Sequence, residues 1–137
     1  MEAICGVLGR RDVDALDAMN AALRTRGEVT HKAVTENYSV AASYPFDELC
    51  LLDGEPRVKT VPKLSPSLLH RYCAEISRSS SLELKGPFAC AVGLDGGARW
   101  WLMRDRLGQR PLYYFHGNRF LVFASELKAL LASGLVP

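Results

Sequence analysis

The clearest structural signal in the sequence is the segment 88-FACAVGLDGGARWWLM-103, in which two apolar runs flank Asp95-Gly96-Gly97. Glycines after an aspartate accept the backbone angles of a tight turn, and apolar runs on both sides are typical of paired strands. A second segment has the same pattern, because runs at 112–115 and 120–124 flank Gly117-Asn118. The two segments predict two antiparallel hairpins in the C-terminal third of the chain.

Outside these hairpins, the spacing of apolar residues predicts short strands and amphipathic helices. Residues that favour N-caps precede each helical pattern, and glycine follows two of them. In chain order the predicted elements are a strand at 4–8, a helix between Asp12 or Asp14 and Gly27, strands at 33–42 and 49–52, a helix after Ser65 or Ser67, and a final helix between Ser125 and Gly134. This order predicts an α+β domain with a largely antiparallel sheet.

Length and composition restrict the class of protein. The chain has 137 residues, which is close to the roughly 150 of an average domain, so we expect a single domain spanning 1–137. Its 48% hydrophobic and 23% charged residues are ordinary for a globular protein. No apolar run approaches the roughly 20 residues of a membrane span. The net charge of +2 is too small to indicate nucleic-acid binding.

The four cysteines and three histidines are widely spaced in the sequence. None of them forms a CxxC pair or a cluster with metal-ligand spacing, so we expect no metal and no cofactor. Cys50, Cys73 and Cys90 lie in apolar stretches, where a free thiol behaves as a small hydrophobic side chain. Free thiols predict a cytoplasmic protein.

Three motifs follow one another in the C-terminal part of the chain: the strand that begins at Phe88, the turn and strand 104-RDRLGQRPLYY-114, and the segment 123-FASELKAL-130. In this order they resemble the class-II glutamine amidotransferase domain of asparagine synthetases. Near the N-terminus, 4-ICGVLG-9 and 24-RTRG-27 are similar to further family elements. The resemblance spans essentially the whole chain and implies the αββα sandwich of the N-terminal-nucleophile hydrolases. It also implies a truncated domain, because family members continue with further strands and an ATP-using synthetase domain.

In that family the nucleophile is a cysteine at the first position of the mature chain, and Cys5 matches it. The α-amino group of the same cysteine acts as the base, since an α-amine titrates at about 7.7–8.0 whereas a peptide nitrogen cannot accept the proton. Four residues, Met1 to Ile4, precede Cys5 here. The resemblance therefore implies catalysis only after cleavage between Ile4 and Cys5.

Other site elements of the family are changed. Asp53-Gly54-Glu55 matches a family Asn-Gly-Glu element, so Asp53 and Gly54 are candidate oxyanion residues and Glu55 is a candidate substrate-binding residue. The loss of one oxyanion donor costs about 10²–10³ in rate. The segment 41–46 lacks the family's arginine for the substrate carboxylate, and Ser65-Pro66-Ser67 lacks its aspartate for the substrate amine. Together these departures predict that glutamine hydrolysis is lost.

Three functions remain open at this stage. The first is a degenerate domain that acts as a binding, regulatory or structural partner of a separate synthetase-type chain or of a second copy, which an uncovered sheet edge would favour. The second is an active glutaminase that supplies ammonia to a separate synthetase chain after removal of Met1–Ile4. The third is nucleic-acid binding through the arginines of 99–110, although a structural turn with Asp105 paired locally is the simpler interpretation of that segment.

Overall fold

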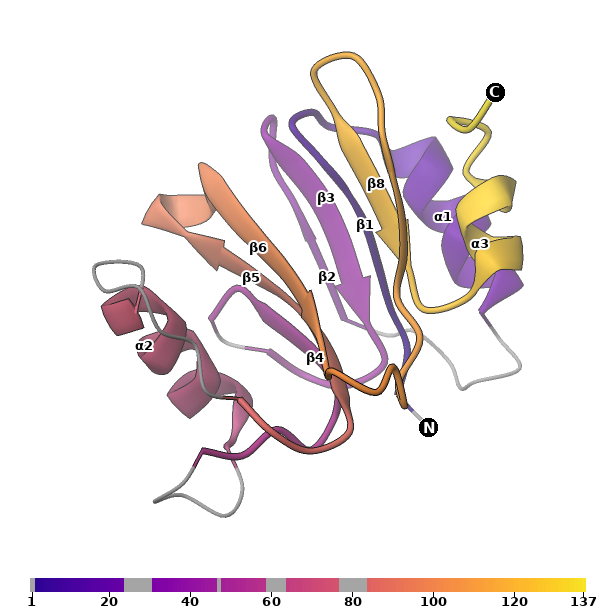
Figure 1. The fold of residues 1–137 in the computed structure, drawn as a ribbon. Coiled ribbons are helices and arrows are strands. Elements are labelled where there is room, and N and C mark those ends of the chain that lie inside the picture. Colours follow the sequence, from indigo (N-terminus) through magenta and orange to yellow (C-terminus); the bar gives the residue numbers. More distant parts are fainter. Residues whose placement is uncertain (1, 24–30, 47, 59–63, 77–83) are drawn as a thin grey trace. The chain divides into compact units, whose positions relative to one another are not determined.

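The computed structural model describes residues 2–23, 31–46, 48–58, 64–76 and 84–137. In these residues the fold is mixed α+β, with two antiparallel sheets and three α-helices (Figure 1). The chain divides into two compact units, residues 1–45 with 111–137 (unit 1) and residues 46–110 (unit 2), and each is described by itself. The predicted α+β class with antiparallel sheets is confirmed, whereas the αββα layering, the truncation and the single domain stay predictions.

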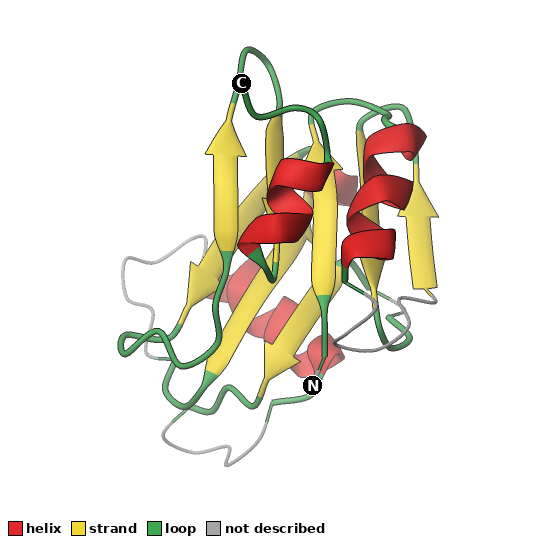
Figure 2. Cartoon of the chain, turned by 90° about the vertical axis from the view of Figure 1, so that its right-hand side faces the viewer, coloured by secondary structure: helices red, strands yellow, loops and turns green. Residues whose placement is uncertain are grey.

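Unit 1 is built on a five-stranded antiparallel sheet with β1 in its centre. In spatial order its strands are β2 (His31–Val34), β3 (Tyr38–Ala42), β1 (Ile4–Leu8), β8 (Leu121–Ala124) and β7 (Tyr113–His116). Helices α1 (Val13–Ala22) and α3 (Leu127–Ala132) contact each other and lie on one face of this sheet (Figure 2). Ala3, Cys5 and Val7 pack in the buried cluster that these helices form with the sheet.

Local sequence explains the position of α1 and the close packing around β1. The Asp12 carboxylate accepts the N–H of Ala15 at 3.0 Å, so Asp12 is the N-cap, which was one of the two predicted positions. Gly6 occupies a site without room for a side chain, because a Cβ atom there would lie 2.7 Å from Val40 Cγ1 and 2.8 Å from the Phe123 ring. Glycine at position 6 therefore allows the side chains of Val40 and Phe123 to pack directly against the backbone of β1.

Unit 2 contains the first of the two predicted hairpins, the one at 88–103. Its three-stranded sheet has the order β4 (Cys50–Gly54), β5 (Phe88–Leu94) and β6 (Arg99–Arg104), and α2 (Pro66–Ile76) contacts β4 and β5. The Ser65 hydroxyl accepts the N–H of Leu68 at 3.2 Å, which places a serine at the start of α2 as expected. The three cysteines of this unit, Cys50, Cys73 and Cys90, are buried free thiols.

Two predictions for unit 1 are wrong. Residues 33–42 form two strands rather than one, because Thr35 makes a tight turn in which its N–H donates to the Tyr38 carbonyl at 2.8 Å and its hydroxyl accepts the N–H of Asn37. Ser125 does not cap α3, whose N-cap is Glu126, because the Ser125 hydroxyl is bonded to Ile4 instead. The predicted helix end at Gly27 lies outside the described residues.

Candidate functional site

Cys5, the candidate nucleophile, lies inside β1 with its side chain in the buried cluster of unit 1. Its relative exposure is 0%, and its thiol donates a hydrogen bond to Asn20 Oδ1 at 3.1 Å. Burial raises the pKa of the Cys5 thiol to about 12, against a smaller lowering by the charge of Lys32. The thiolate is the nucleophilic form of cysteine, so the thiol is unreactive at neutral pH in this environment.

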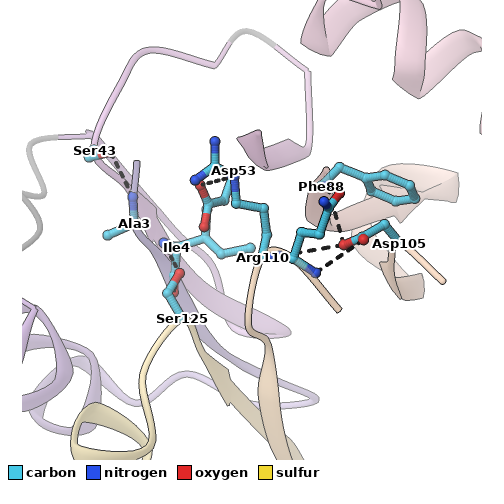
Figure 3. Close-up of polar contacts among 9 residues, drawn as sticks. Ala3, Ile4, Ser43, Asp53, Phe88, Asp105, Arg110 and Ser125 are labelled. Atoms are coloured by element: carbon cyan, nitrogen blue, oxygen red, sulfur yellow. Dashed lines mark hydrogen bonds and ion pairs between the residues drawn. The ribbon is translucent and has the colours of Figure 1, made fainter. Parts of the chain in front are cut away.

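The two residues that precede Cys5 are also integrated in the sheet. Figure 3 shows Ala3 and Ile4 with Ser43 and Ser125 beside them. The N–H of Ala3 donates to Ser43 Oγ and the N–H of Ile4 donates to Ser125 Oγ, each at 2.9 Å. The nitrogen of Cys5 is therefore a peptide nitrogen within continuous strand structure, and it has no basic lone pair to offer.

The candidate oxyanion residues lie at the end of β4 in unit 2. Asp53 pairs with Ala89 of β5 and is fully buried, with 0% relative exposure. Gly54 has a φ of 104°, and a Cβ atom at this position would collide with the carbonyl oxygen of Pro87. Glycine is thus required at position 54 for backbone reasons alone. Glu55 is exposed, and its N–H donates to the same Pro87 oxygen at 2.8 Å.

The buried Asp53 carboxylate has a cation beside it. Nε of Arg110 lies 3.9 Å from Asp53 Oδ1, within ion-pair range but too far for a hydrogen bond (Figure 3). A buried carboxylate is costly unless it is paired, so Arg110 supplies the compensating charge. Asp53 was a candidate from the sequence, but its pairing with Arg110 was not predicted, because only the folded chain brings the two positions together.

Asp105 holds the turn that carries Arg110. Its carboxylate accepts the N–H groups of Gln109 at 3.1 Å and of Phe88 and Arg110 at 3.4 Å. Burial acts to raise the pKa of Asp105, but these backbone donors outweigh it and lower the pKa below its ordinary value. The prediction that Asp105 is paired locally in a structural turn is confirmed. The turn fixes the backbone from which the Arg110 side chain reaches Asp53.

The other two predicted site segments, 41–46 and 65–67, contain neither the expected arginine nor the expected aspartate. Residues 42–45 are the end of β3 and the loop after it, and the Ser43 hydroxyl there is engaged with Ala3. Ser65 begins α2 and uses its hydroxyl on the backbone of Leu68. Cys5 belongs to unit 1 and the Asp53-Gly54-Glu55 element to unit 2, so each has been placed within its own unit.

The described part of the chain offers neither a group of metal ligands nor a membrane-spanning helix. Among the described residues, no group of three or more His, Cys, Asp or Glu side chains has the arrangement needed to hold a metal ion. Likewise, none of the helices in the described ranges combines the length and hydrophobicity needed to cross a bilayer. Each unit holds one buried candidate group. In unit 1 the Cys5 thiol is hydrogen-bonded to Asn20, and in unit 2 the Asp53 carboxylate lies beside Arg110.

Comparison with protein families finds a match in the C-terminal half of the chain. Residues 65–132 match a family model described as a glutamine amidotransferase domain. The matched segment, just under half of the chain, contains α2, the hairpin β5–β6, the hairpin β7–β8 and α3. It leaves out Cys5 and the Asp53-Gly54-Glu55 element. No curated protein matches the chain.

Proposed function

Because residues 65–132 match the glutamine amidotransferase domain family, we propose that the chain is a class-II domain of the asparagine synthetase type that does not hydrolyse glutamine. In this proposal it is a cytoplasmic protein that acts as a binding, regulatory or structural partner of a separate synthetase-type chain or of a second copy. The family match supports the amidotransferase domain. The type is inferred from the motifs at 104–114 and 123–130, which lie inside the matched segment. The loss of activity is inferred chiefly from Cys5 and Asp53, which lie outside it, and the partner role follows from that loss.

The observation that carries the proposal is the state of Cys5. The class-II mechanism needs a cysteine whose own α-amine takes the thiol proton. Here the Cys5 nitrogen is an amide, and its thiol donates to the Asn20 side-chain oxygen, which is not a base. The raised pKa of about 12 keeps the sulfur protonated at neutral pH. Nucleophilic attack on an amide therefore lacks both its base and its thiolate.

The state of Asp53 supports the same conclusion. A carboxylate accepts hydrogen bonds but cannot donate one, so Asp53 cannot stabilise an oxyanion as an asparagine amide does. Its negative charge would also repel the developing charge of a tetrahedral intermediate. Arg110 compensates that charge within unit 2, which makes Asp53 compatible with the fold without making it an oxyanion donor.

Glutamine-dependent ammonia release tests the proposal. We expect the purified 137-residue chain to release no more ammonia than its Cys5→Ala variant, with the N-terminus of each preparation established by intact mass. Ammonia release that disappears in Cys5→Ala would overturn the proposal. If that active preparation also lacked Met1–Ile4, the result would establish the alternative of a processed glutaminase that feeds a separate synthetase chain.

A further inference from the structure

A serine directly follows the last residue of each of the two strands that flank β1. In the β1–β3 ladder Ile4 pairs with Ala42, and Ser43 follows. In the β1–β8 ladder Cys5 pairs with Ala124, and Ser125 follows. The two neighbours of the central strand therefore place a hydroxyl group beside the residues that immediately precede Cys5.

Each serine bonds both backbone groups of one residue. Ser43 Oγ accepts the N–H of Ala3 at 2.9 Å, and the Ser43 N–H donates to the Ala3 carbonyl at 3.0 Å. Ser125 Oγ accepts the N–H of Ile4 at 2.9 Å, and the Ser125 N–H donates to the Ile4 carbonyl at 3.0 Å. The Ser125 hydroxyl also donates to that carbonyl at 3.2 Å. We call these two serines the serine clamp.

The residues that the serine clamp holds are buried, which raises the free-energy cost of losing its hydrogen bonds. Ala3, Ile4 and Ser125 all have a relative exposure of 0%. A buried N–H that loses its acceptor is not rescued by water, so the cost exceeds that of breaking an exposed hydrogen bond. The serine side chains replace carbonyl oxygens that a longer strand would supply, so they extend the sheet around residues 3 and 4 where the ladders end.

We propose that Ser43 and Ser125 form a clamp that keeps Ala3 and Ile4 in the sheet and thereby prevents Cys5 from becoming the first residue of the chain. The inference rests on the proposed function and deepens it, since it names the side chains that protect the Ile4–Cys5 peptide bond from removal of the preceding residues. An exopeptidase must draw a residue out of the sheet before removing it. Removal of Ala3 and Ile4 is therefore limited by opening of the clamp.

Aminopeptidase digestion of the 137-residue chain tests the clamp. The N-terminus is followed by intact mass in the wild type, in Ser43→Ala, in Ser125→Ala and in the double variant. We expect trimming of the wild type to stop at Ala3. Each single variant should expose Cys5 about tenfold faster than the wild type, and the double variant about a hundredfold faster. Ser43→Thr retains the hydroxyl and should behave like the wild type.

A matched control separates the clamp from general destabilisation. Ser133 is a buried serine whose hydroxyl donates to Leu130 within α3 at 2.6 Å, so Ser133→Ala loosens unit 1 without touching β1. It should leave the trimming pattern unchanged. Amide exchange in the undigested chains should accelerate at Ala3 and Ile4 in the clamp variants only.

Three outcomes would overturn the clamp. They are trimming of the wild type to Cys5 at the rate of the double variant, unchanged exchange at Ala3 and Ile4 in the double variant, and equal acceleration of trimming by Ser133→Ala. The proposed function fails separately. If the trimmed product released ammonia from glutamine, the clamp would stand while the loss of glutaminase chemistry would be refuted.

Discussion

Replacing Asp105 by asparagine tests the turn that holds Arg110. The carboxylate accepts three backbone N–H groups, one at 3.1 Å and two at 3.4 Å. An asparagine keeps one acceptor oxygen and turns an NH₂ group toward at least one of these donors. Hydrogen bonds to charged groups contribute about 1.5–3 kcal/mol each, and a buried unsatisfied group costs about 1–3 kcal/mol. Because two of the contacts are long, we expect a loss of about 2–3 kcal/mol in the free energy of unfolding.

Tryptophan fluorescence during urea unfolding is the appropriate assay. The chain has two tryptophans, Trp100 and Trp101, and both lie in β6 of unit 2, so the signal reports the unit that contains Asp105. With a slope of about 1–3 kcal/mol per molar urea, the midpoint should fall by about 0.7–3 M at pH 7. Asp95→Asn is the matched control. Asp95 is exposed, has a φ of 54° that asparagine tolerates, and its side chain makes a surface ion pair with Arg99.

The pH dependence gives an independent check. The pKa of Asp105 is lower in the folded chain than in the unfolded chain, so its stabilisation is fully present above the unfolded value of about 3.9. It is lost as the pH falls through the lower folded value. The difference between the wild type and Asp105→Asn should therefore be constant at neutral pH and shrink below about pH 4. A midpoint unchanged at pH 7, or a difference that grows in acid, would refute the reasoning.

Three further changes test the other parts of the account. Arg110→Met removes the cation beside the buried Asp53 and should lower the free energy of unfolding by about 2–4 kcal/mol, while adding Asp53→Asn should restore most of it; equal losses in the single and double variants would show that the pair is not coupled. Gly54→Ala should cost at least about 1 kcal/mol, because of its φ of 104° and the contact with the Pro87 oxygen, and a neutral effect in the same titration would contradict the backbone argument. Iodoacetamide at pH 8 should label no cysteine in the native chain and four in denaturant, counted by intact mass, since all four are buried; rapid native labelling of Cys5 would contradict its burial.

Local patterns in the sequence were sufficient for much of the fold. The turn Asp95-Gly96-Gly97 adopts positive φ at all three residues and joins β5 to β6, as its composition predicts. Gly134 has a φ of 74° just after α3, where a C-terminal glycine was expected. These features depend on neighbours in sequence, so the residues themselves carry the information.

The errors and omissions concern contacts between distant positions. Ser125 has the composition of a helix cap, but a backbone N–H 121 positions away takes its hydroxyl. The motif that contains Arg110 resembles a structural turn, and nothing in its spacing indicates that the side chain reaches Asp53. Asp53 itself was identified through its match to a family element. The negative charge of Asp53 was interpreted as evidence that oxyanion stabilisation is lost. The structure adds that Arg110 lies beside this charge.

A chain that begins at Cys5 tests the central claim most directly. Expression from Met followed by residues 5–137 exposes Cys5, because the initiating methionine is removed before a small residue, and intact mass and circular dichroism verify the product and its fold. If the glutaminase site is degenerate beyond its blocked amine, this chain releases no more ammonia from glutamine than its Cys5→Ala counterpart. Ammonia release that depends on Cys5 would contradict the account, since it would mean that Asp53 and Arg110 still permit the chemistry.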